Sequence, residues 1–141
     1  KYKVIGFEAA QEIQGVQSPI YHTNVMMHIG TDIAVVCLDS IVKASGRKKV
    51  QESLIKSGKK VIPITPKQKF NFAGNMLEVS NEGGEKFTVM SQTAYDSLTI
   101  GQIQSIEKYT TIISPSLPTI EKLGGGSARC MMAENFLPIG K

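Results

Sequence analysis

The sequence predicts a single α/β domain in which a strand–strand–helix–strand unit occurs twice and begins a third time. Strand-like and helix-like segments alternate along the 141 residues, a length that suits one domain. Corresponding segments also recur at a nearly constant spacing. Residues 24–26 and 75–77 are 51 positions apart, and residues 35–38 and 87–90 are 52 apart. A fixed spacing that contains a whole supersecondary unit is typical of a repeat architecture.

The first unit covers approximately residues 19–65 and follows a short predicted strand at 4–9. Residues 33–38 form a continuous apolar run, which is typical of a strand covered on both faces. Gly58 stands where a glycine commonly ends a helix. Pro63 indicates that the last strand lies at a sheet edge or ends at this residue. The expected elements are strands at 25–29 and 33–38, a helix at 45–57 and a strand at 61–64.

The second unit covers approximately residues 72–114 and repeats this order. Thr99 and Gln102 have the spacing of a capping box, which marks the start of a helix. The expected elements are strands at 75–79, 87–90 and 110–113, a hairpin turn at 81–84 and a helix at 99–108. Residues 118–141 then form a partial third unit, in which 127–133 is expected to be the first strand.

Composition argues against several classes of protein. The net charge is only +4, and the 16 Lys and Arg are scattered among few aromatic residues, so we expect no nucleic-acid partner. No apolar run approaches the roughly 20 residues of a membrane span, so we expect no membrane partner. Two cysteines 93 positions apart make neither a disulfide framework nor a paired metal motif, which favours a cytoplasmic location. Because the chain opens without Met inside a strand-like run, we expect it to be part of a longer protein.

Cys130 is the first residue to consider as a candidate for a catalytic role. It follows three glycines at 124–126, and two interpretations stay open: a small buried thiol after a glycine turn, or a nucleophile approached by glycine amides. Cys37 lies within an apolar strand and is expected to be core. His22, Asn75 and Cys130 precede or begin the first strands of the three units. If the units surround an axis, these three residues meet at one point, which makes His22 and Cys130 a candidate base and nucleophile.

The other histidine does not suit a catalytic or metal-binding role. His28 has no partner at the spacing of helical metal ligands, and we expect it to form a local hydrogen bond at the end of its strand. No metal-binding residues are therefore assigned.

Three segments together resemble a known family. Residues 19–27, 72–78 and 124–134 are similar to the arginine-deiminase-related amidinotransferase-like proteins of the guanidino-group-modifying (pentein) superfamily, and most similar to the citrulline-hydrolase-like branch. The resemblance implies a five-bladed α/β propeller around a polar axis. It also implies that residues 1–141 form one incomplete domain, the C-terminal portion, with about two and a half blades.

The resemblance also assigns roles to four residues. Cys130 matches the nucleophile, His22 matches the general acid and base, and Asn75 matches a residue that lines the centre. Asn24 stands where arginine deiminases carry an aspartate that binds the guanidinium. The implied reaction is attack of the thiolate on a planar carbon, with a covalent S-linked intermediate that water hydrolyses, and it needs no metal or organic cofactor.

The residue at position 24 bears on the substrate. A guanidinium offers only N–H donors, whereas a ureido group also presents a carbonyl oxygen, to which an asparagine amide can donate. We therefore expect a ureido compound, with citrulline favoured, to bind at Asn24 and Asn75. Asn24 can alternatively serve only as a turn-forming residue.

Other functions stay open beside citrulline hydrolysis. The chain could belong to an arginine deiminase or an amidinotransferase, or it could be a non-catalytic propeller fragment that acts as a binding module. Unpaired strand edges at both ends predict a partner, either the missing N-terminal half or another copy of the chain.

Overall fold

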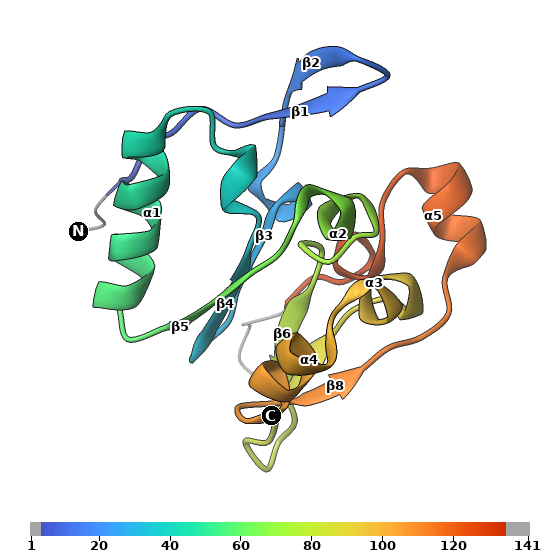
Figure 1. The fold of residues 1–141 in the computed structure, drawn as a ribbon. Coiled ribbons are helices and arrows are strands. Elements are labelled where there is room, and N and C mark those ends of the chain that lie inside the picture. The colour runs from blue at the N-terminus through green and yellow to red at the C-terminus, as the bar shows by residue number, and fades with distance from the viewer. Residues whose placement is uncertain (1–3, 135–141) are drawn as a thin grey trace.

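The computed structural model describes residues 4–134, which fold as a mixed α/β arrangement with three small sheets (Figure 1). Two of the sheets have three strands each, and the third is a two-stranded hairpin. Within the described residues, no helix combines the length and the apolar character needed to cross a bilayer.

The first three-stranded sheet contains β3 (Met27–Ile29), β4 (Ile33–Val36) and β5 (Lys60–Pro63), in that order. β3 and β4 are antiparallel, and β4 and β5 are parallel. Parallel neighbours need a crossover, which α1 (Ala44–Lys56) provides. The prediction for 33–38 is confirmed over 33–36, and Pro63 ends the edge strand as expected.

The helix α1 ends where the sequence predicts. Gly58 has a φ of +83°, and its N–H donates to the Ile55 carbonyl, while the Lys59 N–H donates to the Leu54 carbonyl. This pair of bonds is a Schellman motif, in which glycine is favoured because it adopts positive φ without a steric penalty. On its inner face the helix buries Val50 and Leu54.

The second three-stranded sheet repeats the same order. It contains β6 (Leu77–Ser80), β7 (Lys86–Val89) and β8 (Thr111–Ile113), with β6 and β7 antiparallel and β7 and β8 parallel. The crossover contains α3 (Gln92–Ser97) and α4 (Ile100–Glu107). Thr99 and Gln102 form the predicted capping box at the start of α4.

Some predicted strands lie at other residues than expected, and one of them is a helix. Residues 4–9 contribute only an isolated bridge between Ala9 and Ile41, and the strands lie further on, in the hairpin of β1 (Ala10–Ile13) and β2 (Val16–Pro19). Residues 127–133 are not a strand: the 3-10 helix η3 (Ala128–Met131) occupies this stretch. Only residues 118–134 of the expected partial unit lie within the described residues.

The predictions also missed three short helices. Two of them are α2 (Pro66–Phe70) and α5 (Pro118–Gly124), each with proline in its first turn, and the third is α3, capped by Ser91. None has more than seven residues, so none shows a full amphipathic period.

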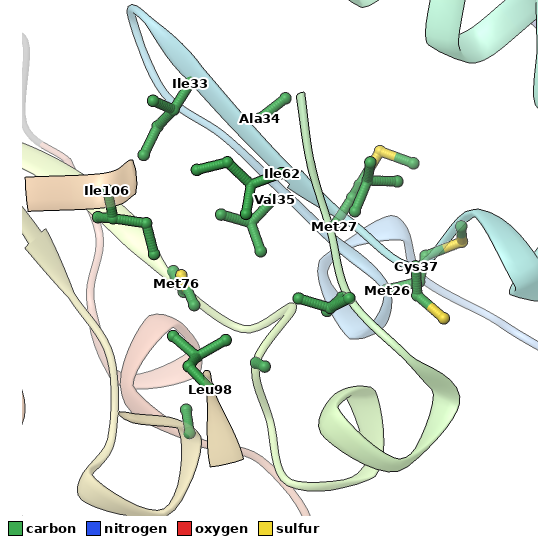
Figure 2. Close-up of a cluster of buried hydrophobic side chains, with 14 of the residues drawn as sticks. Met26, Met27, Ile33, Ala34, Val35, Cys37, Ile62, Met76, Leu98 and Ile106 are labelled. Atoms are coloured by element: carbon green, nitrogen blue, oxygen red, sulfur yellow. The ribbon is translucent and has the colours of Figure 1, made fainter. Parts of the chain in front are cut away.

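One hydrophobic core joins the two larger sheets. Ile33 and Val35 of β4 lie in the same buried cluster as Met76 before β6 and Ile106 of α4 (Figure 2). Cys37 is also fully buried in this cluster, which confirms its predicted place in the core.

A pair of glutamines also connects the two units. Gln68 closes the capping box of α2 and Gln102 closes that of α4. The Gln68 Nε2 donates to Gln102 Oε1 at 2.7 Å, and the Gln102 Nε2 donates to the Pro63 carbonyl at 2.7 Å. The two helix starts therefore hold each other in place.

Gly74 allows the two units to approach at the backbone level. A Cβ added there would lie 2.7 Å from the Val25 carbonyl oxygen and 2.8 Å from the Met26 carbonyl carbon. Such distances are shorter than van der Waals contact, and the atoms concerned belong to the backbone, which cannot rotate away as a side chain can.

We predict that Gly74→Ala lowers the free energy of unfolding by about 1–3 kcal/mol, the usual range for overpacking. Chemical denaturation of the full-length protein measures this. The control is Gly101→Ala in α4, where an added Cβ meets nothing within 4 Å and a gain of about 0.5–1 kcal/mol is expected. Equal stabilities of the two variants would contradict the close approach at Gly74.

Candidate functional site

Asn75 and Cys130 are in direct contact. The Asn75 Nδ2 lies 3.2 Å from Cys130 Sγ and 3.4 Å from the Asn24 carbonyl oxygen. Asn75 is buried just before β6, whereas the Cys130 thiol is exposed within η3. The structure therefore brings together two residues that the sequence places 55 positions apart.

The orientation of the Asn75 amide follows from its second partner. The Arg129 backbone N–H donates to Asn75 Oδ1 at 3.1 Å. Because a backbone N–H can only donate, the oxygen of the amide must face it, and the NH₂ group must face the sulfur. An amide donor stabilises a sulfur that carries negative charge.

Two further contacts hold the segment that carries Cys130. The Arg129 Nη1 donates to the Met76 carbonyl at 3.0 Å, which fixes η3 against the start of β6. At Gly126, an added Cβ would lie 3.1 Å from Cys130 Sγ, so a side chain there would displace the thiol. Among the described residues the hydrogen-bond donor to Sγ is Asn75 and not a glycine amide.

Glu121 anchors the turn before Cys130 to α3. Its carboxylate accepts hydrogen bonds from Ser127 Oγ at 2.7 Å and from Thr93 Oγ1 at 2.6 Å. Burial alone would raise the pKa of Glu121, but hydrogen bonds from Ser91, Thr93 and Ser127 together lower it. The charged carboxylate therefore keeps the glycine turn in one position.

Cys130 opens into a hollow of about 290 Å³. Its lining includes Asn75, Tyr21 and Phe72, and also Lys69 of α2. Phe72 has a φ of +63°, an unusual value for a residue with a side chain. A positive φ strains the backbone of a residue that has a side chain, and it persists where the surrounding structure enforces it. Phe72 lies two residues before the close approach at Gly74.

His22 is connected to this site but does not line the same hollow. Its Nδ1 accepts the Asn24 backbone N–H at 3.1 Å, which caps the 3-10 helix η1 (Thr23–Val25). The exposed ring lies in a neighbouring hollow of about 250 Å³, and Tyr21 belongs to the lining of both. In the neutral ring this bond leaves the proton on Nε2.

The four predicted residues thus form a connected series. Hydrogen bonds lead from His22 through the Asn24 backbone to Asn75 and from there to Cys130. The Asn24 carboxamide itself has no hydrogen-bond partner among residues 4–134, so it is free to bind a ligand. Sequence reasoning missed Arg129 and Lys69, since nothing in their neighbours distinguishes them from other basic residues.

His28 differs from its expected role. It is fully buried, and among the described residues no hydrogen bond at the end of its own strand satisfies either ring nitrogen, so the predicted local hydrogen bond is wrong. Burial is the main cause that lowers the pKa of His28 to about 4, and the positive charge of Arg129 adds to it. The carboxylate of Glu78 and the backbone of Met76 raise the pKa of His28, but less than burial and Arg129 lower it.

Two of three comparisons relate the chain to known proteins. A family model described as eukaryotic N,N-dimethylarginine dimethylhydrolase matches residues 1–137. The fold is similar to the crystal structure of apo ArgZ, an arginine dihydrolase from the ornithine-ammonia cycle in cyanobacteria, with a TM-score of 0.59 and 16% identity. This match covers 78% of the chain but only 16% of ArgZ. The comparison with curated proteins found no match.

The buried His28 predicts a loss of stability in acid. Its pKa is about 4 in the folded protein and near 6.5 when unfolded, so between these values only the unfolded state binds the proton. The stability is complete above pH 6.5 and decreases as the pH falls towards 4, by roughly 3 kcal/mol in total. Denaturation of the wild type and of His28→Leu at several pH values isolates this contribution. Equal pH dependence of the two proteins would contradict it.

Proposed function

Since the chain belongs to the family of eukaryotic N,N-dimethylarginine dimethylhydrolases, we propose that it contributes the nucleophile of an enzyme that hydrolyses a C–N bond in a ureido or guanidino compound. The observation that carries this proposal is the 3.2 Å contact between the Asn75 amide and the exposed Cys130 sulfur. The Cys37 sulfur also accepts a hydrogen bond, from Ser40 Oγ at 3.4 Å, but it is fully buried in the apolar core, whereas the Cys130 sulfur is open to a substrate.

In the proposed reaction the Cys130 thiolate attacks the planar carbon of the substrate. The C–S bond forms, and the C–N bond to the leaving nitrogen breaks as that nitrogen receives a proton from His22. A water molecule, deprotonated by His22, then attacks the same carbon, and the C–S bond breaks to return the thiolate. Asn75 stabilises the negative sulfur at the start and end of this cycle.

His22 must change partners to perform these steps. As a cap, its Nδ1 accepts the Asn24 N–H and cannot hold a proton at the same time. In the proposed reaction the ring leaves this bond and turns to the substrate. Its exposure makes such a movement inexpensive, because no packed neighbour has to be displaced.

We favour citrulline as the substrate on the basis of Asn24. A ureido oxygen must accept a hydrogen bond in the site, and the unpartnered Asn24 carboxamide can donate one. An aspartate there would face that oxygen with a carboxylate, at a cost on the order of 1–3 kcal/mol. Arginine deimination and amidino transfer are the alternatives, and the family description adds dimethylarginine as a further substrate to compare.

The two larger sheets support a propeller as the architecture of the whole enzyme. They share one strand order and meet at the site, as neighbouring blades around an axis would. In this proposal further blades come from residues outside the chain or from another copy. The hairpin of β1 and β2 extends away from the body in Figure 1 and exposes Ile13 and Val16, which suits a surface that another segment covers.

We expect that the 141-residue chain alone associates at micromolar concentration, because its edge strands and exposed apolar side chains remain without partners. Sedimentation velocity measures this, with the full-length protein as the control. A well-behaved monomer of the isolated chain would contradict the proposed assembly.

The substrate preference is measured on the full-length protein, assayed with citrulline, arginine and dimethylarginine under identical conditions. We expect release of ammonia from citrulline to be the fastest reaction. Asn24→Asp should move the preference towards arginine, since a carboxylate favours the cationic guanidinium.

Two variants serve as controls for the same assay. Cys130→Ala should abolish turnover of every substrate, and His22→Ala should reduce it by the ~10² to 10⁴ typical of a lost acid–base group. A clear preference of the wild type for arginine or dimethylarginine would overturn the assignment of citrulline. Full activity of Cys130→Ala would overturn the proposed mechanism.

A further inference from the structure

Phe72 occupies a backbone position that favours glycine. It follows Asn71, the C-cap of α2, and its φ is +63°. The Phe72 N–H donates to the Lys69 carbonyl at 3.0 Å, and the Ala73 N–H donates to the Gln68 carbonyl at 3.0 Å. These two bonds form a Schellman motif, in which glycine is the usual residue because a side chain strains the backbone at positive φ.

The other helix ends of this kind in the chain do carry glycine. Gly58 closes the Schellman motif of α1 with a φ of +83°, and Gly125 follows α5 with a φ of +65°. Among residues 4–134, three helices are thus closed by a residue with positive φ, and Phe72 is the one with a side chain. A side chain that stays at a strained position is expected to make a contact that offsets the strain.

The ring of Phe72 has two surroundings. Part of it packs against the hydrophobic core, and the side chain is half-buried. Phe72 also lines the hollow of about 290 Å³ that contains Cys130. A ring that served the core alone would be buried in it, whereas this ring keeps exposed surface beside the reactive sulfur.

The turn of residues 72–75 presents a flat ring and an amide to the same hollow. The Asn75 N–H donates to the Phe72 carbonyl at 2.8 Å, which closes the turn, and the Asn75 side chain lies 3.2 Å from Cys130 Sγ. A planar conjugated group offers flat faces that stack on an aromatic ring. A thiolate attacks a planar carbon from one face, so the opposite face remains available for such a contact.

We propose that Phe72 is a specificity-determining residue, whose ring packs against the flat face of the ureido or guanidino group that Cys130 attacks. This assignment rests on the proposed function. It requires the flat shape of the ring and not merely its apolar volume. The strained turn of α2 is the structural consequence of placing an aromatic ring where the backbone favours glycine.

Protection of Cys130 against iodoacetamide measures this contact as binding. Butylurea carries a planar ureido group on a plain alkyl chain, and 1-pentanol has a chain of similar length without that group. In the full-length protein, Phe72→Leu keeps apolar volume but loses the flat face. The butylurea concentration that halves the alkylation rate should rise about three- to tenfold, as for the loss of one aromatic contact. Any protection by 1-pentanol should be unchanged.

Three further variants complete this experiment. Phe72→Tyr keeps the ring and should keep the protection of the wild type. Phe70→Leu removes another aromatic ring from the lining of the same hollow and should leave protection by butylurea unchanged. Phe72→Gly removes the ring together with the backbone strain, so it serves as the second measurement if Phe72→Leu is poorly folded. It should weaken protection as Phe72→Leu does.

Other results reject the proposal. Equal protection of the wild type and Phe72→Leu by butylurea would show that the ring makes no contact with the planar group. Equal weakening for butylurea and 1-pentanol would show that the ring only fills space. A slower alkylation of Phe72→Leu without any ligand would show that Phe72 acts on the position of Cys130.

The corresponding experiment with substrate separates this inference from the proposed function. For citrulline, Phe72→Leu should raise KM about three- to tenfold with kcat unchanged, and Phe72→Tyr should match the wild type. A protein whose protection by butylurea depends on the ring, but which hydrolyses no ureido or guanidino compound, would retain the binding face and lose the proposed function. Turnover of citrulline with a KM that does not depend on the ring would retain the function and reject the inference.

Discussion

The side chain of Asn75 joins three segments of the chain that are more than 50 residues apart from one another along the sequence. Its oxygen accepts the Arg129 N–H, and its NH₂ group faces both the Asn24 carbonyl and the Cys130 sulfur. A primary amide has one acceptor and one donor end, so fixing the first determines the second. This geometry exists only because Gly74 lets the turn before Asn75 lie against the backbone of Val25 and Met26.

The site therefore lies at a junction between structural units, not within one of them. Asn24 and His22 precede the first strand of one sheet, Asn75 precedes the first strand of the next, and Cys130 follows both sheets in the sequence. The shared core and the hydrogen bond between Gln68 and Gln102 fix the position of the two sheets relative to each other. Displacement of one sheet relative to the other would separate Asn24, and with it His22, from Asn75.

Around Cys130 the charges are distributed unevenly. Glu121 anchors the glycine turn from outside the hollow, the Arg129 guanidinium donates to the Met76 carbonyl, and burial lowers the pKa of His28. Among residues 4–134, Lys69 is the charged side chain in the lining, and it also lines the neighbouring hollow beside Gln11. The site thus combines an amide that donates to sulfur with a cation whose Nζ donates to a neutral amide oxygen.

The sequence by itself determined the α/β class, the order of the two sheets, the end of α1 at Gly58 and the start of α4 at Thr99, because these depend on local hydrophobic pattern and on capping. It also identified Asn75 and Cys130 as candidates for one site. Only the tertiary structure decided that 128–131 is a 3-10 helix, that the Asn75 amide faces the Cys130 sulfur and that Lys69 lines the Cys130 hollow. Those features depend on contacts between residues distant in sequence, and no local pattern encodes which partner a buried polar group will find.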